Sequence, residues 1–395
     1  MGRLMEFEPW MLLIFPLFFG MGWLAARIDI KEILSENHAL PQSYFKGLNF
    51  LLNEQQDKAI EAFIEVVKVD PQTVELHFAL GSLFRRRGEV DRALRMHHNL
   101  VDRADLDNAR RQQAIFELAQ DYLKAGILDR AESLFRELRK SAYAKQSLEF
   151  LLELFQKERD WLKAIDAARQ LAEISGESRN KLIALFYCEL AQEELTAGHQ
   201  DAAHEHLQQA LKACPDCVRA SIMLGDMALA RGDREGTIAY WKTIETQDAR
   251  YLPLVAERLL QTCTELGRES EGIALLRGYL DKYHSVDMMN VLFTAVSRSE
   301  GAAAAYQLVR DALHKNPSLI GLDKLLEARL LEVPEERRAD VELVRNLLQQ
   351  RTRNLAMYHC RQCGFKARQF YWHCPACQSW DSYLPRRMEE TELQS

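Results

Sequence analysis

The sequence predicts an all-α protein in which stacked helical hairpins form a superhelical solenoid. Glycine and proline together account for 28 of the 395 residues, about 7% against a typical ~12%. This shortage of turn-forming residues argues against a sandwich, barrel or propeller made of many short strands. Beyond Pro41 the apolar residues follow a helical spacing, and the sequence repeats itself with a period near 34 residues, which is typical of a repeat array.

Small residues mark the repeat. Gly47 and Gly81 are 34 residues apart, and so are Ala59 and Ala93. The same distance separates Ala191 from Gly225 and Ala203 from Thr237, and a spacing of twelve recurs within units at Gly47/Ala59, Gly81/Ala93, Ala119/Ala131 and Ala191/Ala203. Two antiparallel helices cross closely at such positions, where a larger side chain would force them apart. The pattern is that of the tetratricopeptide repeat.

Turn and stop signals complete the units. An apolar residue lies four positions after the second small residue, at Phe63, Phe135, Leu207 and Trp241, and a turn glycine lies five before it, at Gly88, Gly126, Gly198 and Gly232. Pro71 and Pro215 fall where the second helix should stop. We expect about eight units up to roughly Pro317 and one or two capping helices over residues 319–355. Offsets of 38 or 39 residues in the middle of the array predict insertions at turns.

Four cysteines near the C-terminus have the spacing of a metal site. Cys360 and Cys363 form one C-x2-C pair, Cys374 and Cys377 form a second, and ten residues separate the pairs. Each pair can present two thiolates from a tight turn, and four thiolates complete a tetrahedral site with no open position. We therefore predict a module over residues 355–386 that holds one tetrathiolate-bound ion, iron or zinc, since both metals accept an all-sulfur site.

The residues around these cysteines support the metal assignment. Gly364 suits the left-handed conformation that ends such a turn. Six aromatic residues are expected to cover the site and to give a short segment its core, namely Tyr358, Phe365, Phe370, Tyr371, Trp372 and Trp380. His359 and His373 are predicted to be surface residues because four thiolates already complete the site. Cys214 and Cys217 also form a C-x2-C pair, which we interpret as a structural turn between repeats.

The N-terminus carries an apolar segment, residues 10–26, without a charged residue. As a helix it would rise about 26 Å at 1.5 Å per residue, near the lower limit for crossing a bilayer core. Trp10 and Trp23 near its ends suit the membrane interface. We predict an uncleaved span within an anchor of residues 1–30. A cleaved signal peptide fits less well because residues 20–22 match a cleavage site weakly and a basic leader is lacking, and a buried soluble helix would need a polar face.

Basic residues orient this segment. Arg3 precedes it, whereas Arg27, Lys31 and Lys46 follow it. The positive-inside rule therefore places the body of the chain on the cytoplasmic side. A site of four reduced thiols favours the same compartment.

A basic cluster on the second repeat contrasts with the net charge of −7, which itself disfavours a nucleic-acid binder. Its candidate partner-binding arginines are Arg85, Arg86, Arg87, Arg92 and Arg95, with His97, His98 and Arg103 nearby. Such a run is either a solvated helix face or a docking patch for an acidic segment. The chain shows no P-loop, dinucleotide fingerprint, nucleophile elbow or H-E-x-x-H helix, so we predict no enzyme.

The order of the predicted parts resembles that of the lipopolysaccharide assembly protein B (LapB) family of Gram-negative inner membranes. These parts are an anchor, repeats over residues 41–354, a four-cysteine module and a tail of residues 387–395 without fixed structure. The segments NFLLNEQQDKAIEAF, GSLFRRRGEVDRAL, FYCELA and YWHCPACQSW carry the resemblance, which covers essentially the whole chain. The four cysteines match that family's metal ligands, in a module that is rubredoxin-like. The ten-residue gap is shorter than in true rubredoxins, and extra residues precede the apolar segment.

The resemblance implies a non-catalytic regulator of lipopolysaccharide biosynthesis in the bacterial inner membrane. Such proteins promote proteolysis of the lipid A pathway deacetylase LpxC by the FtsH protease and scaffold other lipopolysaccharide assembly proteins. A homo-oligomer stays open. The alternative hypothesis is a membrane-tethered electron carrier with a tetrathiolate iron centre. It requires an exposed, reversible redox couple, which the expected aromatic cover disfavours.

Overall fold

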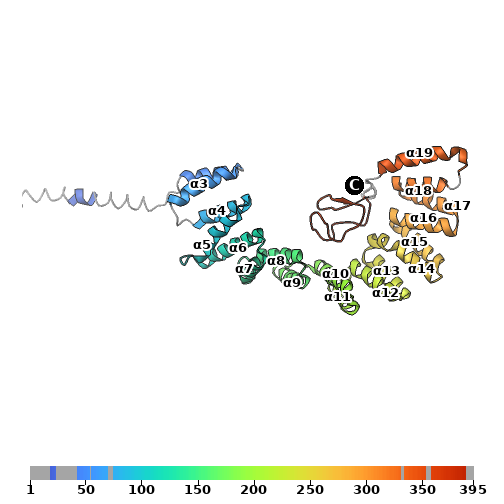
Figure 1. Cartoon of the computed structure of the whole chain (residues 1–395), viewed down its shortest axis with the longest axis horizontal. Helices are drawn as coiled ribbons and strands as arrows, with labels where there is room; N and C mark the ends of the chain where they lie inside the picture. Colours follow the sequence, from blue (N-terminus) through green and yellow to red (C-terminus); the bar gives the residue numbers. More distant parts are fainter. Residues whose placement is uncertain are drawn as a thin grey trace, which may run out of the picture. The chain divides into compact units, whose positions relative to one another are not determined.

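Antiparallel helical hairpins follow one another along the chain in the computed structural model, which describes residues 18–23, 42–53, 55–69, 74–330, 333–352 and 357–387 (Figure 1). The predicted tetratricopeptide solenoid is confirmed. The helix pairs of the described chain are α2 (Gln42–Leu52) with α3 (Gln56–Val69), α4 (Val74–Arg87) with α5 (Val90–Asp102), α6 (Asn108–Ala125) with α7 (Leu128–Glu137), α8 (Ala144–Glu158) with α9 (Trp161–Ser175), α10 (Asn180–Ala197) with α11 (Gln200–Ala213), α12 (Val218–Ala230) with α13 (Arg234–Asp248), α14 (Ala256–Glu265) with α15 (Glu269–Tyr283), α16 (Val286–Ser299) with α17 (Ala302–Lys315), and α18 (Leu319–Leu330) with α19 (Glu335–Thr352).

Two 3₁₀ helices and one small sheet complete the described elements. The 3₁₀ helices are η1 (Leu138–Lys140) and η2 (Ala249–Leu254), and the strands are β1 (Tyr358–His359) and β2 (Lys366–Ala367). The chain divides into two compact units, residues 1–150 and 151–395. The second unit contains both the later repeats and the four-cysteine module.

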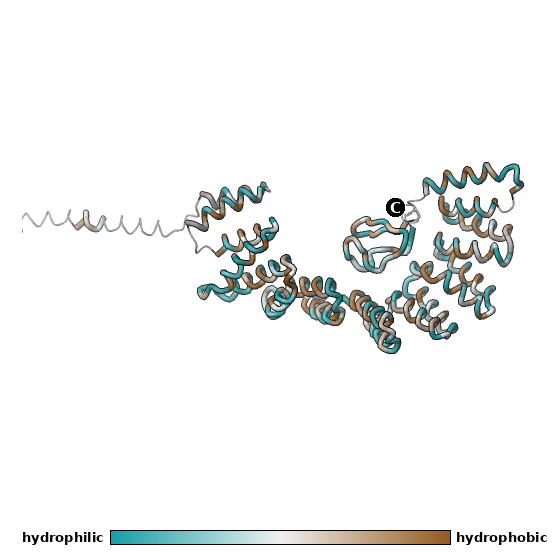
Figure 2. Tube along the Cα trace, viewed as in Figure 1, coloured by the Kyte–Doolittle hydropathy of each residue, from teal (hydrophilic) through white to brown (hydrophobic). Residues whose placement is uncertain are grey.

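Small residues lie where the helices of a hairpin cross, as the repeat pattern predicts. Ala59, Ala93 and Ala203 are completely buried. A Cβ atom added at Gly47 would collide with the ring of Phe63, and one added at Gly225 would collide with the indole of Trp241. The close crossing buries an apolar stripe on each amphipathic helix, so that polar and apolar residues alternate along the helices (Figure 2).

The helix boundaries follow the turn and stop signals, with one correction. Gly126 and Gly198 end α6 and α10 in the left-handed conformation, with φ of 77° and 87°, and α11 stops two residues before Pro215. Pro71 lies outside the described residues. The extra residues of the middle units do not lie only at turns: α6 and α10 have 18 residues each, against 14 in α4. The four additional residues make about one helical turn, which leaves the crossing positions in register.

The predicted membrane segment lies mostly outside the described residues. Residues 18–23 are helical, and the remainder of residues 10–26 is not described, nor is the tail beyond residue 387. Within the described part of the chain, no helix has the length and apolar character needed to cross a bilayer. The anchor therefore stays a prediction.

Candidate metal centre and partner surface

Two similar turns present the four cysteines. In the first, the Gly364 N–H donates to the Cys360 carbonyl oxygen over 2.8 Å; in the second, the Gln378 N–H donates to the Cys374 carbonyl oxygen over 2.9 Å. Both turns end in the left-handed conformation, with φ of 75° at Gly364 and 58° at Gln378. The conformation predicted for Gly364 is confirmed. β1 and β2 flank the first turn as an antiparallel pair, with Tyr358 opposite Ala367.

The sulfur atoms converge on one point. Cys360 Sγ lies 3.7 Å from Cys377 Sγ, Cys363 Sγ lies 3.8 Å from Cys374 Sγ, and all four sulfurs lie within 4.8 Å of one another. Thiolates around a tetrahedral ion at about 2.3 Å are separated by about 3.8 Å. The donor set therefore fits one tetrahedral ion. It is the one cluster of three or more His, Cys, Asp or Glu ligands found in the described residues.

The two thiols of the first turn differ in pKa because their surroundings differ. Burial opposes ionisation of Cys360, but the Ser382 hydroxyl, 3.2 Å from its sulfur, and backbone N–H groups outweigh burial and lower the pKa of this thiol to about 6. At Cys363 the backbone N–H of Phe365 favours the thiolate. Partial loss of hydration at the sulfur and the neighbouring cysteines outweigh that contact and raise the pKa of Cys363 to about 12. A bound cation would favour the thiolate at every position.

The two turns differ in exposure. Cys360 and Cys374 are completely buried, whereas Cys363 and all of residues 361–366 are exposed. Tyr383, which the sequence pattern does not single out, is fully buried against both interior cysteines, and its hydroxyl donates to the Phe365 carbonyl oxygen over 3.2 Å. The first turn therefore faces solvent, and Tyr383 closes the inner side of the site.

Trp380 fixes the module to the repeats. Its indole N–H donates to Gln156 Oε1 of α8 over 2.7 Å. Its ring packs edge-on against Trp161 at 6.0 Å and Phe186 at 5.6 Å between centroids. This corrects the expectation for Trp380, whose described contacts join the module to α8, α9 and α10. Tyr358, Phe370 and Tyr371 do pack in the cluster that contains Cys360 and Cys374, as expected.

Asp381 and Trp372 extend the same interface. The Tyr251 hydroxyl donates to Asp381 Oδ1 over 2.6 Å, and Lys181 forms an ion pair with Asp381 Oδ2. Burial and the Asp381 carboxylate raise the pKa of Tyr251, so this phenol stays protonated and can donate. Trp372 stacks on Tyr251 at 5.3 Å, and the guanidinium of Arg219 lies 5.9 Å from the centre of the Trp372 ring.

A third contact completes the interface around Asp287. The Tyr358 hydroxyl donates to Asp287 Oδ2 over 2.8 Å, and Arg387 Nε donates to the same oxygen over 2.9 Å. Lys181, Arg219 and Asp287 are each the second residue of their helices, α10, α12 and α16. The module thus contacts the first turns of three helices that each begin a hairpin, α10, α12 and α16, while its Cys363 turn stays exposed.

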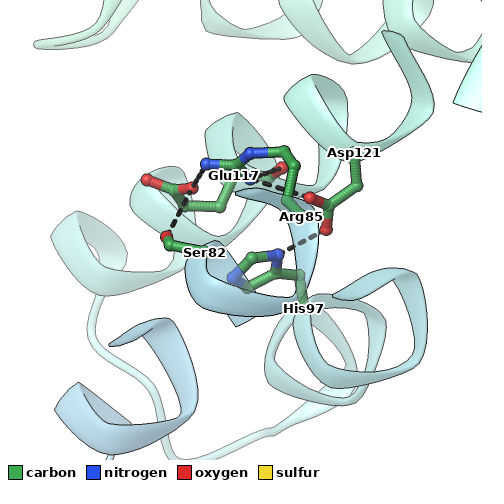
Figure 3. Close-up of polar contacts among 5 residues, drawn as sticks. All are labelled: Ser82, Arg85, His97, Glu117 and Asp121. Carbon is green, nitrogen blue, oxygen red and sulfur yellow. Dashed lines mark hydrogen bonds and ion pairs between the residues drawn. The ribbon is translucent and has the colours of Figure 1, made fainter. Parts of the chain in front are cut away.

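The predicted arginine patch separates into two parts in the first unit. Arg85 Nη2 lies 2.6 Å from Glu117 Oε2, and its Nη1 lies 2.7 Å from Asp121 Oδ1 (Figure 3). Asp121 also contacts His97 Nδ1 at 2.5 Å, and the Ser82 hydroxyl donates to Glu117 over 3.3 Å. His97 and Asp121 are completely buried. Arg85 therefore joins α4 to α6 as part of a buried network.

The other arginines of the patch are exposed. Arg87 pairs with Asp57 and Glu89, and Arg92 pairs with Glu89 at 2.6 Å. Arg95 Nε donates to the backbone carbonyl of Asp91 over 3.2 Å. Arg86 is exposed at the end of α4. These four arginines are therefore accessible from solvent, whereas Arg85 is mostly buried in the network with Glu117 and Asp121.

The remaining cysteine and histidine candidates do not belong to the cluster of four sulfurs. Cys217 is the N-cap residue before α12, and its N–H donates to the Cys214 carbonyl oxygen over 3.0 Å, as in a turn. Its sulfur lies 3.9 Å from that of the buried Cys188. His373 stacks on Trp380 at 4.3 Å, and its Nε2 lies 2.8 Å from the Gln378 carbonyl oxygen.

Comparisons with known proteins identify the family. The curated relative "Lipopolysaccharide assembly protein B" of Escherichia coli strain K12 is 34% identical over 381 residues, which cover 95% of this chain and 97% of that protein. The chain belongs to the lipopolysaccharide assembly protein B family. A protein of the same name from Haemophilus influenzae is 29% identical over 391 residues, 96% of this chain and 98% of the relative.

Two family models match parts of the chain, one at the four-cysteine module and one in the repeats. The family described as "Rubredoxin metal binding domain" matches residues 358–383, and the family described as "Tetratricopeptide repeat" matches residues 46–95 and 188–241. A crystal structure of a tetratricopeptide repeat protein from Parabacteroides merdae aligns with a TM-score of 0.33 at 13% identity, over 73% of this chain and 99% of that one.

Proposed function

We propose that this protein is a membrane-anchored, non-catalytic adaptor that regulates lipopolysaccharide biosynthesis. In this proposal it promotes proteolysis of the deacetylase LpxC by the FtsH protease and scaffolds other lipopolysaccharide assembly proteins. The observation that carries the proposal is a full-length match to lipopolysaccharide assembly protein B in a chain whose hairpin array offers protein-binding surface.

The metal has a structural role in this proposal. Cys360, Cys363, Cys374 and Cys377 would hold one zinc or iron ion, because their sulfurs have tetrahedral spacing. When bound, the ion supplies a cross-link between the two turns of a short segment that has little apolar core of its own. The second turn leads directly into Trp380 and Asp381, so a rigid site also fixes the residues that contact the repeats.

Tethering supplies the regulatory mechanism. In the proposal residues 10–26 cross the inner membrane and the repeats lie on the cytoplasmic side, where they hold the client beside a membrane-bound protease. Restricting two molecules to one surface raises their effective concentration without any new contact. The adaptor therefore needs both its anchor and its repeats.

Deleting residues 1–26 tests the mechanism. We expect the shortened protein to stay folded and to bind the deacetylase, but to leave the cellular half-life of that enzyme prolonged. The matched control replaces residues 10–26 with an unrelated single-pass span and should restore normal turnover. If the shortened protein supports normal turnover at native expression level, the tethered mechanism is wrong.

One observation favours the electron-carrier alternative. Cys363 is exposed, so an iron ion held there would lie close to solvent and to a redox partner. Loading the purified protein with redox-inert zinc separates the two functions. An adaptor loaded with zinc should support reconstituted deacetylase degradation as well as one loaded with iron. A requirement for iron would favour electron transfer.

A further inference from the structure

A hollow on the first unit combines apolar and basic residues. It has a volume of about 390 Å³ and lies between α3, α4 and α5. We call it the arginine hollow and define it by its lining residues Ile64, Leu80, Phe84, Arg92, Arg95, Met96 and Asn99. Two of these residues are cationic and none is acidic. The hollow therefore has a positive rim in a chain whose net charge is negative.

The floor of the arginine hollow suits an apolar side chain. Leu80 and Phe84 are almost completely buried, and Ile64 and Met96 are partly buried beside them. Concave apolar sites of roughly 300–1,000 Å³ are those that bury most of a ligand's surface. Methionine adds a flexible side chain that adapts to different occupants. A partner with a flat surface could not fill this hollow, whereas one or two bulky side chains that protrude from a partner could.

The rim suits carboxylates. The Arg92 guanidinium lies 4.0 Å from the centre of the Phe84 ring, which holds it over the floor. Its Nη1 pairs with Glu89 at 2.6 Å, and this is its one carboxylate contact within the described residues, so Nε and Nη2 can meet a second carboxylate. Arg95 lies one helical turn further along α5 and donates to a backbone carbonyl; its contacts within the described residues include no carboxylate. Arginine binds carboxylates through paired hydrogen bonds. Arg95, and Arg86 on the neighbouring helix end, therefore offer positive charge to a partner.

We propose that the arginine hollow docks a short acidic segment of a partner protein, with a bulky apolar side chain on the floor and flanking carboxylates on Arg92 and Arg95. This inference rests on the proposed adaptor function, for which it names the chemistry of a bound partner. It replaces the wider five-arginine patch, because Arg85 is committed to Glu117 and Asp121.

Peptide binding to the full chain in nanodiscs tests the inference. The probe is a fluorescein-labelled peptide of sequence EEDLFDEE, measured by fluorescence anisotropy at two salt concentrations. The Arg92→Glu/Arg95→Glu double variant should weaken binding by about tenfold or more. Lys124→Glu, an exposed charge reversal on α6 of the same unit, should leave binding unchanged. High salt should reduce the difference because screening already weakens the contact.

A second peptide tests the floor. Replacing the central Leu-Phe of the probe with Ser-Ser should lower the affinity by about tenfold or more, since each bulky side chain contributes roughly 1.5–3 kcal/mol on burial. Equal affinity of the two peptides would overturn the inference. So would equal affinity of the unmodified chain and the double variant.

Three further outcomes would each overturn the inference in a different way. Displacement of the probe from the unmodified chain by phosphatidylglycerol vesicles, but not by phosphatidylcholine vesicles, would assign the arginines to the membrane surface instead. Tighter probe binding after removal of residues 388–395, which include three glutamates, would assign the arginine hollow to the chain's own tail. A double variant that loses the probe yet keeps normal deacetylase turnover would refute docking of a client and leave the adaptor function standing.

Discussion

His97 occupies in the second repeat the position that Phe63 and Trp241 occupy in others. In each case the ring lies against a glycine of the preceding helix, here Gly81. His97 is completely buried, and its Nδ1 contacts Asp121 from the next repeat. A polar side chain is stable at this position because the adjoining hairpin supplies its partner. The second hairpin therefore has a side-chain contact with the third that an apolar residue could not make.

Replacing Gly81 by alanine should destabilise the first unit. The new methyl group would collide with the ring of His97, whose position Asp121 fixes, and overpacking of this kind costs about 1–3 kcal/mol. Gly278→Ala is the matched control, because this exposed helical glycine has open space around it and the change should stabilise by about 0.4–1 kcal/mol. Urea unfolding followed by circular dichroism measures both. A shift in the same direction for the two variants would contradict the packing argument.

Replacing Asp121 by asparagine should cost more than replacing Glu117 by glutamine. Asp121 is completely buried and serves both Arg85 and His97, so the substitution removes the charge of a buried carboxylate with two partners and costs about 3–5 kcal/mol. Glu117 is 18% exposed, so water can partly replace it and the cost should be about 1 kcal/mol. Unfolding midpoints of the two variants check this order, and equal losses would show that the network does not depend on burial.

At the scale of the element, each hairpin is specified by residues close together in sequence, and these were predictable. The small residues at the crossings, the turn glycines and the stop before Pro215 all follow from local sterics. The place of an insertion does not follow, because four extra residues can either loop out or add a turn to a helix, and packing decides between them. Packing also decides the environment of His97. The sequence places this residue beside surface arginines, but its partner Asp121 lies 24 residues away, so its burial could not be predicted locally.

The four-cysteine module shows where prediction ends. The spacing of Cys360, Cys363, Cys374 and Cys377 was enough to predict one site, because each turn fixes two sulfurs locally. The destination of Trp380 was not predictable, since its hydrogen-bond partner Gln156 lies 224 residues away. Nothing in the aromatic composition of the segment distinguishes a cover for the metal from a face that contacts helices.

Trp380→Ala should separate the module from the repeats without removing the metal. The change deletes the hydrogen bond to Gln156 and the contacts with Trp161 and Phe186, at a cost of about 3–5 kcal/mol if the side chain is as well packed as a core residue. Hydrogen exchange of residues 357–387 should accelerate while metal content stays at one ion per chain. Phe365→Ala, on the exposed first turn, is the control and should change neither measurement. Loss of metal from the Trp380 variant would show that docking and metal binding are one event.

Cys374→Ser should release the ion. Its sulfur is completely buried, and three remaining thiolates cannot complete a closed tetrahedral site. We expect less than one ion per chain by elemental analysis and fast hydrogen exchange in the module, since the segment depends on the metal for its fold. Cys188→Ser, which removes a buried cysteine outside the cluster, should keep the ion. Full occupancy in the Cys374 variant would overturn the four-cysteine assignment.

At the scale of the whole molecule, the order of the parts suits the proposed adaptor, which would work by holding its binding surfaces at the membrane. An apolar segment precedes one compact unit with exposed arginines, and a second unit carries the metal module fixed to its helices. The chain belongs to a family named for lipopolysaccharide assembly, and the adaptor proposal requires its body on the side where its thiols stay reduced. The orientation of the anchor is therefore the property on which the other proposals depend.

A reporter fusion tests this orientation. Arg27, Lys31 and Lys46 follow the apolar segment and outweigh Arg3 before it, so the positive-inside rule retains the C-terminal body in the cytoplasm. Alkaline phosphatase, which is active only in the periplasm, should therefore give no signal when fused after residue 395, whereas a cytoplasm-active reporter at the same point should give a strong one. Because the bias rests on few charges, replacing Arg27 and Lys31 by glutamine and adding three lysines before residue 10 should shift fusions toward the periplasm. A strong phosphatase signal from the unmodified chain would place the body outside the cytoplasm, away from a cytoplasmic client, and the adaptor mechanism would fail with it.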